Sequence, residues 1–201
     1  MVKEFLKNLF NRNKKKSSYL NELINAVIDG NIVKVNYLIE KKKINLESKD
    51  ILGRTALIHL ILIRNALTYY FLHHKWIKND AKIRIIQIYD TIFHRLIEVN
   101  QRLEHINMKT GEGKTALIYA SMLGLYDYVD YLLLHGADAN IEGNDNKTAL
   151  MHAENKMIYD RLEPVTWNKA PPIPEFIYIT LCNNNNIQNL LPSYEESLDN
   201  K

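Results

Sequence analysis

A short pattern that returns after 33 residues limits the possible folds of this chain more than any other feature. Residues 115–120 read Thr-Ala-Leu-Ile-Tyr-Ala, and residues 148–153 repeat them as Thr-Ala-Leu-Met-His-Ala. Another copy, Thr-Ala-Leu-Ile-His, begins at residue 55, and a fainter one runs from Asn21 to Ile39. Self-similarity at such a period indicates a stack of small units that bury their apolar faces only against neighbouring copies.

The unit around residues 113–141 predicts two short helices. Thr115 has the side chain of a helix N-cap, and apolar residues follow it at helical spacing. Gly124 predicts a break after this helix, and Gly136 predicts the end of a second one. Gly53, Gly113 and Asn146 precede the repeated threonines and predict backbone angles that most residues avoid.

With this period and its Thr-x-Leu opening, the chain resembles the ankyrin repeat family, whose signature is Thr-Pro-Leu-His-x-Ala. The resemblance implies an all-α solenoid of about four helix-turn-helix repeats with β-hairpin fingers, over residues 20–163. Alanine replaces the family's proline in three copies, at positions 56, 116 and 149. Ile58, Ile118 and Met151 replace its histidine. Because these replacements remove polar bridges, we expect packing to hold the repeats together.

The second repeat carries an insertion at residues 65–91. From Thr55 to Thr115 is 60 residues, which is 27 more than the period, and residues 65–91 contain no Gly or Pro. We predict that both helices are lengthened into a protruding hairpin that turns near Lys78-Asn79-Asp80. The predicted seam on its returning helix consists of Ile83, Ile86, Tyr89 and Phe93. Its aromatic residues form either a partner-specific surface or the hairpin's own packing.

The two ends of the chain differ from the repeats. Residues 1–19 form a basic amphipathic arm, which either docks on the first repeat as a cap or binds an anionic membrane surface. We favour the cap. All five prolines follow Arg161, so we assign residues 164–201 to a C-terminal cap and tail, with residues 176–181 folding back over the last repeat.

Nothing in the sequence predicts an enzyme, a cofactor or a metal site. Gly111-Glu112-Gly113-Lys114-Thr115 ends like a phosphate-binding loop, but Met108 stands where such a loop needs glycine, so Lys114 is read as a solvent-exposed finger residue. The histidines lack the spacing of metal ligands. The single Cys182 and the absence of an apolar leader or membrane span predict a cytoplasmic protein.

The ankyrin resemblance implies a monomeric module that binds another protein through its concave face, with no nucleic acid. The bias of this sequence toward Asn, Ile and Lys is typical of ankyrin proteins from large DNA viruses, AT-rich bacteria and parasites. This bias suggests a host-pathogen interaction in the host cytoplasm. The expected contact residues on the inner helices are His59, Leu62, Ile63, Tyr119, Met122 and Leu123. Those expected on the fingers are Met108, Lys109, Glu112, Glu142 and Asn144.

An adaptor is the alternative function. The basic arm would bring it to a membrane surface, or the tail would recruit a ubiquitin ligase. Leu191, Pro192 and Tyr194 form a Leu-Pro-x-Tyr variant of the motif that WW domains bind as a polyproline-like segment.

Overall fold

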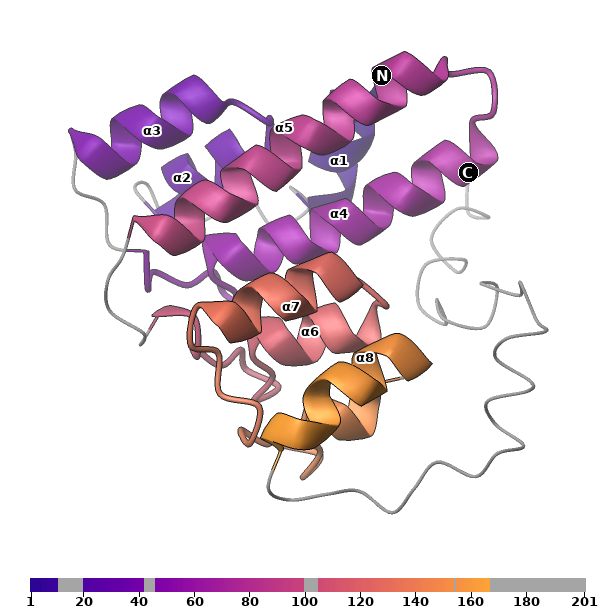
Figure 1. The fold of residues 1–201 in the computed structure, drawn as a ribbon. Helices are drawn as coiled ribbons and strands as arrows, with labels where there is room; N and C mark the ends of the chain where they lie inside the picture. The colour runs from indigo at the N-terminus through magenta and orange to yellow at the C-terminus, as the bar shows by residue number, and fades with distance from the viewer. Residues whose placement is uncertain (11–19, 42–45, 100–104, 154, 167–201) are drawn as a thin grey trace, which may run out of the picture.

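A computed structural model describes residues 1–10, 20–41, 46–99, 105–153 and 155–166, and this part of the chain is helical with no strand. The elements, shown in Figure 1, are α1 (Val2–Phe10), α2 (Leu20–Ile28), α3 (Ile32–Glu40), α4 (Ala56–His73), α5 (Asn79–Glu98), α6 (Ala116–Met122), α7 (Tyr126–Leu134), η2 (Leu150–His152), α8 (Lys156–Leu162) and η3 (Glu163–Val165).

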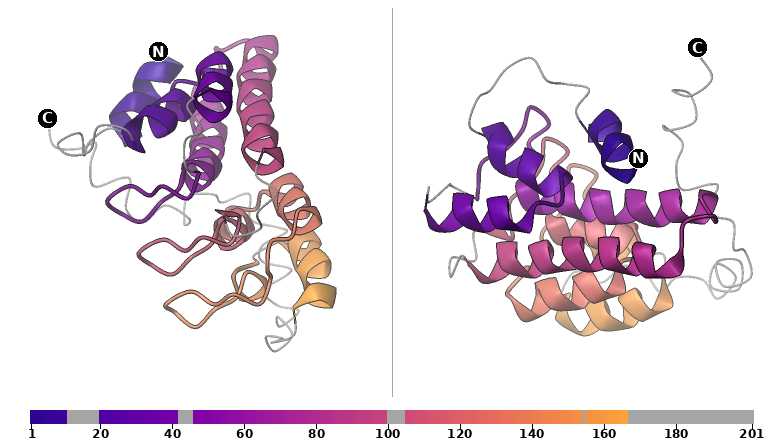
Figure 2. Two further views of the ribbon diagram at one scale, coloured as in Figure 1. Left: turned by 90° about the vertical axis from the view of Figure 1, so that its left-hand side faces the viewer. Right: turned by 90° about the horizontal axis from the view of Figure 1, so that it is seen from above.

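The helices form four antiparallel pairs that stack side by side in two layers. The pairs are α2–α3, α4–α5, α6–α7 and η2–α8. An inner layer contains α2, α4 and α6, and an outer layer contains α3, α5, α7 and α8 (Figure 2). Each inner helix packs on the next one, so the predicted all-helical stack of about four repeats is confirmed.

Repeated threonines cap the starts of α4 and α6, as their position predicts, and a third threonine stands two residues before η2. The hydroxyl oxygen of Thr115 accepts a hydrogen bond of 3.3 Å from the backbone N–H of Ile118. Thr55 and Thr148 make the same contact three residues ahead, at 3.4 Å each. All three threonines are buried, so a loss of this cap leaves a buried donor without its partner.

Three loops precede these threonines, and we call them the finger loops: residues 49–54, 109–114 and 142–147. Each is closed by backbone hydrogen bonds, such as the 3.0 Å bond from Thr110 to Lys114, but none is assigned as a strand. The predicted β-hairpins are therefore tight reversals too short for a ladder. The positive φ angles expected at Gly53, Gly113 and Asn146 are present, at 74°, 76° and 56°.

The second pair is lengthened, as the insertion predicts. Helix α4 has 18 residues and α5 has 20, against 7 and 9 in the next pair. The turn between them spans residues 74–78 and so lies slightly before the predicted position. Tyr89 and Phe93 are buried in the seam, Ile86 is half-buried, and the prediction for Ile83 is wrong because its side chain is 52% exposed.

Helix α1 docks on the repeats. Leu6 is fully buried, and the ring of Phe5 lies 4.6 Å from that of Tyr70 on α4. Lys7 forms a 3.3 Å ion pair with Asp29 beside α2. In both views of Figure 2, α1 lies on the opposite side of α4 from α5. The apolar side chains of Phe5 and Leu6 are therefore used inside the molecule.

The fourth pair differs from what the sequence led us to expect. Its outer helix α8 is a full helix that runs to Leu162. The shortened element is the inner one, which is reduced to the three-residue η2. Residues 176–181, predicted to cover this pair, lie outside the described residues.

The glycine at the second finger loop gives a stability test. A Cβ on Gly113 would lie 2.7 Å from the backbone nitrogen of Asn144 on the next loop, in a conformation that already costs a side chain about 1–2 kcal/mol. Asn146 has the same backbone conformation, but no further finger loop follows it in the described chain. We expect Gly113→Ala to lower the thermal unfolding midpoint by several degrees, measured by circular dichroism, and the control Asn146→Gly to leave it nearly unchanged. Equal effects of the two substitutions would contradict close contact between the loops.

Candidate protein-binding surface

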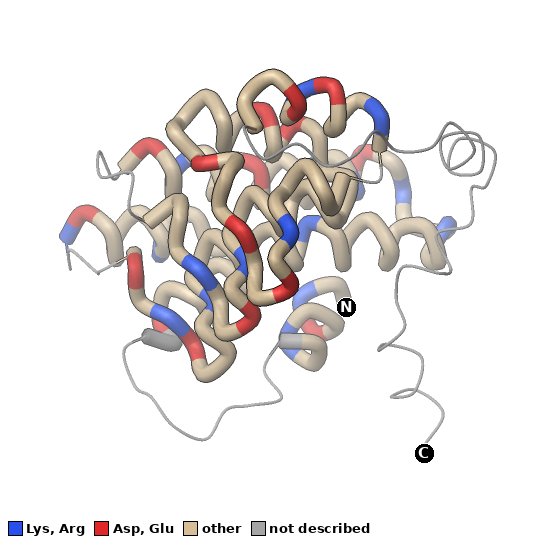
Figure 3. Tube along the Cα trace, turned by 90° about the horizontal axis from the view of Figure 1, so that it is seen from below, with Lys and Arg blue, Asp and Glu red and all other residues tan. Residues whose placement is uncertain are grey.

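The finger loops and the inner helices face the same side of the molecule, and we call this side the finger-side surface. In the left view of Figure 2 the loops project away from the inner helices, on the side opposite α5, α7 and α8. Basic and acidic residues are interspersed along the loops (Figure 3).

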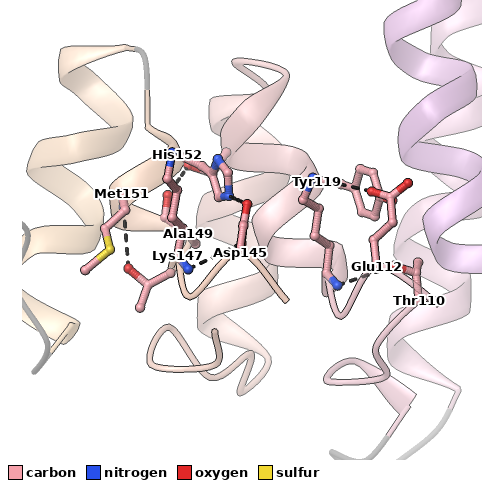
Figure 4. A network of polar contacts seen from close by, with 11 residues as sticks. Thr110, Glu112, Tyr119, Asp145, Lys147, Ala149, Met151 and His152 are labelled. Atoms are coloured by element: carbon pink, nitrogen blue, oxygen red, sulfur yellow. Dashed lines mark hydrogen bonds and ion pairs between the residues drawn. The ribbon is translucent and has the colours of Figure 1, made fainter. Parts of the chain in front are cut away.

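In α4, α6 and η2, a polar side chain reaches back to the preceding finger loop. His59 Nε2 lies 2.9 Å from Asp50 Oδ2, and His152 Nε2 lies 3.0 Å from Asp145 Oδ2. The hydroxyl of Tyr119 donates a long hydrogen bond of 3.5 Å to Glu112 Oε2. Figure 4 shows the latter two contacts. These side chains stand one position after Ile58, Ile118 and Met151, so polar bridges are supplied from the neighbouring position.

Successive finger loops are also hydrogen-bonded to each other. Gly111 donates its backbone N–H to Leu52 O at 3.0 Å, and Asn144 donates to Glu112 O at 3.1 Å. Ser121, which is fully buried, donates its hydroxyl to Ala149 O at 2.6 Å. The expectation that packing alone holds the repeats together is therefore incomplete. Hydrogen bonds to backbone carbonyl oxygens also join neighbouring repeats, and a pattern of side chains in the sequence does not reveal such bonds.

Half of the predicted inner-helix contact residues are covered by the chain itself. His59, Ile63 and Tyr119 are 3%, 0% and 8% exposed, so the expectation that they face solvent is wrong. The two polar residues turn toward the finger loops, and Ile63 belongs to the core. Leu62, Met122 and Leu123 are half-buried, each with part of its side chain accessible.

The predicted finger residues remain accessible. Lys109, Glu112 and Asn144 are exposed, and Met108 and Glu142 are intermediate. Lys109 Nζ donates to Glu142 O at 2.9 Å, and the Asn144 side chain donates to Gly111 O at 3.0 Å, so both side chains are tethered to a neighbouring loop. Lys114 lies on a finger loop as predicted, but its side chain is only 17% exposed and is not in open solvent.

Ile51 and Leu52 at the tip of the first finger loop were missed by the sequence analysis. Their side chains are 70% and 45% exposed. In the sequence they stand beside the apolar start of the second repeat and give no signal of exposure. Their position follows from Asp50, whose Oδ1 accepts the backbone N–H groups of Leu52 and Arg54 at 2.8 Å each and fixes the turn.

The polar links also affect ionisation. Burial by itself would raise the pKa of the Asp50 carboxyl. Hydrogen bonds from His59 and from two backbone N–H groups lower that pKa by more than burial raises it, so it lies below its usual value. Burial lowers the pKa of His152 in spite of its neighbour Asp145. The pKa of Asp145 is lowered by His152 and by backbone donors, which outweigh its desolvation. Burial raises the pKa of Tyr119, which stays a neutral hydrogen-bond donor.

Two kinds of site are not found among the described residues. No group of three or more His, Cys, Asp or Glu residues is placed to hold a metal ion. In this part of the chain no helix is both long enough and apolar enough to cross a membrane. Cys182 and the tail residues Leu191, Pro192 and Tyr194 lie outside the described residues.

The stacked helix pairs and linked finger loops define a helical repeat solenoid. Residues 85–162 match the family model for ankyrin repeats in three copies, which covers the end of the second unit through the fourth. Over residues 85–162 the chain is built of ankyrin repeats.

Comparison with solved structures gives the ankyrin repeat domain of Bcl-3, described as a unique member of the IkappaB protein family, at 25% identity and a TM-score of 0.46. That match covers 69% of this chain and 50% of the Bcl-3 chain, so it spans half of that chain's length. Among curated proteins no sequence matches.

The contact between His152 and Asp145 predicts a pH dependence. Because the folded-state pKa of His152 is lowered, the unfolded chain binds more protons than the folded one as pH falls below the ordinary histidine pKa of about 6.5. The stability contributed by neutral His152 is complete above that pH and is lost as pH falls. We expect the difference in thermal midpoint between the wild type and His152→Gln to shrink from about pH 7.5 to about pH 5.5. His73→Gln, at an exposed site, is the control. A difference that grows at low pH would mean that His152 is protonated in the folded state.

Proposed function

We propose that the chain binds another protein through the finger-side surface. Ankyrin repeats are generally protein–protein interaction modules, and this chain carries them over residues 85–162. The family supports a binding role in place of catalysis.

The observation that carries the proposal is the pair of exposed apolar side chains on the first finger loop. Ile51 and Leu52 are 70% and 45% exposed, although their backbone is fixed. Leu52 O accepts from Gly111, and Leu52 N donates to Asp50. An apolar pair on a rigid loop loses little conformational entropy on binding, which favours affinity. Contact between such apolar side chains and water is unfavourable, so a partner that covers them gains binding free energy from their burial.

Half-buried apolar residues on the inner helices extend this contact. Leu62 on α4, with Met122 and Leu123 at the end of α6, offers further accessible apolar surface. Lys109, Glu112 and Asn144 supply charged and polar groups on the later finger loops. Protein interfaces commonly combine an apolar centre with a polar rim, and the residues of this surface fit that pattern. Met108 and Glu142 complete the proposed contact set.

We place this interaction in the cytoplasm, with the chain acting as a monomer. The single cysteine of the sequence supports a reducing compartment. The Asn, Ile and Lys bias supports a viral, bacterial or parasite source, in which case the partner is a host protein.

Paired surface variants test the proposal. The full chain serves as bait in the native cell extract, and captured proteins are identified by mass spectrometry. We expect Leu52→Ser with Met122→Ser to lose the partner, because both side chains are at least partly accessible and would contact it. Leu134→Ser is the control, since Leu134 is 68% exposed on the outer helix α7.

The two results that would contradict the proposal differ. Unchanged capture by the double variant would move the binding site off the finger-side surface. A large fall in its thermal midpoint would show that these residues hold the fold together, because substitutions at exposed sites usually change stability by less than about 0.5 kcal/mol. Loss of capture by Leu134→Ser as well would point to the outer helices.

A further inference from the structure

We propose that the tip of the α4–α5 hairpin docks on the surface of an anionic lipid bilayer. The hairpin tip consists of residues 69–84, where the two long helices extend past the ends of α6 and α7 (Figure 1). Leu72, Trp76 and Ile83 on it are 49%, 65% and 52% exposed. This inference is independent of the protein-binding proposal, because the tip is separate from the finger loops in sequence and in space.

Unpaired cations surround these apolar side chains. Lys75, Lys78 and Arg84 are exposed, and none of them forms an ion pair with another described residue. Asp80 is the only acidic residue of the tip, and it lies in the first turn of α5, where the helix dipole favours a negative charge. The tip therefore carries excess positive charge that anionic headgroups attract.

The structure presents Trp76 on a rigid support. The rings of Tyr70 and His74 stack at 3.9 Å, and the edge of Trp76 meets His74 at 6.2 Å. Lys82 Nζ donates to Phe71 O at 3.3 Å and so satisfies a carbonyl at the end of α4. Tryptophan is enriched at membrane–water interfaces, where its ring meets headgroups and acyl chains together. A bilayer would cover its exposed part without rearrangement of the turn.

The form of the tip favours a bilayer over a protein partner. A stable protein interface buries roughly 800 Å² on each side and needs complementary shape. The tip is a convex turn with three well-exposed apolar residues, and a fluid bilayer accepts such a projection without a matching pocket.

The tip also fits a bilayer better than the amphipathic arm does. In α1, Leu6 is fully buried and Phe5 lies against Tyr70, so its apolar face is already occupied. Lys7 is paired with Asp29. On the tip, by contrast, Leu72, Trp76 and Ile83 are exposed, and so are Lys75, Lys78 and Arg84.

Vesicle sedimentation with the full chain tests the proposal. We expect the chain to bind vesicles of phosphatidylcholine with phosphatidylserine and not to bind vesicles of phosphatidylcholine alone. Binding to the anionic vesicles should weaken as the salt concentration rises from about 0.1 M to about 1 M, because salt screens the charges. Lys75→Glu with Lys78→Glu should lower partitioning on the order of tenfold. Lys41→Glu with Lys147→Glu makes the same change in net charge at exposed sites outside the tip and should keep most of the binding.

Fluorescence tests insertion of the tip itself. Trp76 and Trp167 are the only tryptophans, so Trp167→Phe leaves Trp76 as the single emitter. Its emission should shift to shorter wavelength with the anionic vesicles and stay unchanged with the neutral ones. Trp76→Ala should weaken sedimentation while the thermal midpoint stays near that of the wild type, since the side chain is 65% exposed.

Several outcomes would overturn the proposal. The proposal is wrong if the wild type does not bind anionic vesicles, if both charge-reversal pairs lose binding equally, or if the Trp76 emission does not shift. If Lys14→Glu, Lys15→Glu and Lys16→Glu together abolish binding while the tip variants keep it, the arm is the membrane site. The tip belongs to an interface with a second copy if the wild type binds no vesicles but self-associates in sedimentation velocity, and Trp76→Ala abolishes that association. It belongs to a protein partner if the wild type binds no vesicles but captures a protein that Trp76→Ala loses.

Discussion

The close approach of successive finger loops determines how the rest of the molecule is arranged. Leu52 O and Glu112 O each accept a backbone N–H from the following loop, at 3.0 Å and 3.1 Å. The first of these bonds brings the backbone of Gly111 to within 2.6 Å of where a Cβ on Gly53 would stand. A loop that carried a side chain there would push its neighbour away. Because the threonine caps follow directly after each loop, the loop spacing also sets the spacing of the inner helices.

The lengths of the helices vary much more than the spacing of the finger loops. Helices α4 and α5 are lengthened by more than ten residues each over the next pair, yet the stack continues past them. The added length is compatible with the stack because the returning helix keeps its contacts near α7. Phe93 stacks on Tyr128 at 3.8 Å, and the Tyr128 hydroxyl donates to Asp90 at 2.8 Å. The extra turns lie at the far end of the hairpin and do not separate the pairs.

Sequence periodicity predicted the parts of the fold that depend on local pattern. The 33-residue spacing gave the unit, the threonines gave the helix starts, and Asn146 was recognised as a residue able to take the place of glycine at positive φ. The exposure of inner-helix residues was predicted less well. The helical spacing predicts that His59 and Tyr119 face outward, but each turns to a carboxylate on its own finger loop, nine and seven residues before it. Spacing gives the face of a helix, but not whether a polar tip bends back to a loop.

In the insertion, too, the sequence predicts the helices but not which side chains are accessible. Its helical character follows from the absence of Gly and Pro, whereas the accessibility of each aromatic residue depends on where the chain turns. The turn at residues 74–78 puts Tyr70 and Phe71 in the buried seam and leaves Trp76 outside it. Helix α1 then covers Tyr70 through Phe5, which no repeat pattern indicates because the arm lies outside the repeats. The two interpretations of the aromatic cluster, self-packing and an accessible surface, therefore apply to different residues of the same hairpin, divided by the position of one turn.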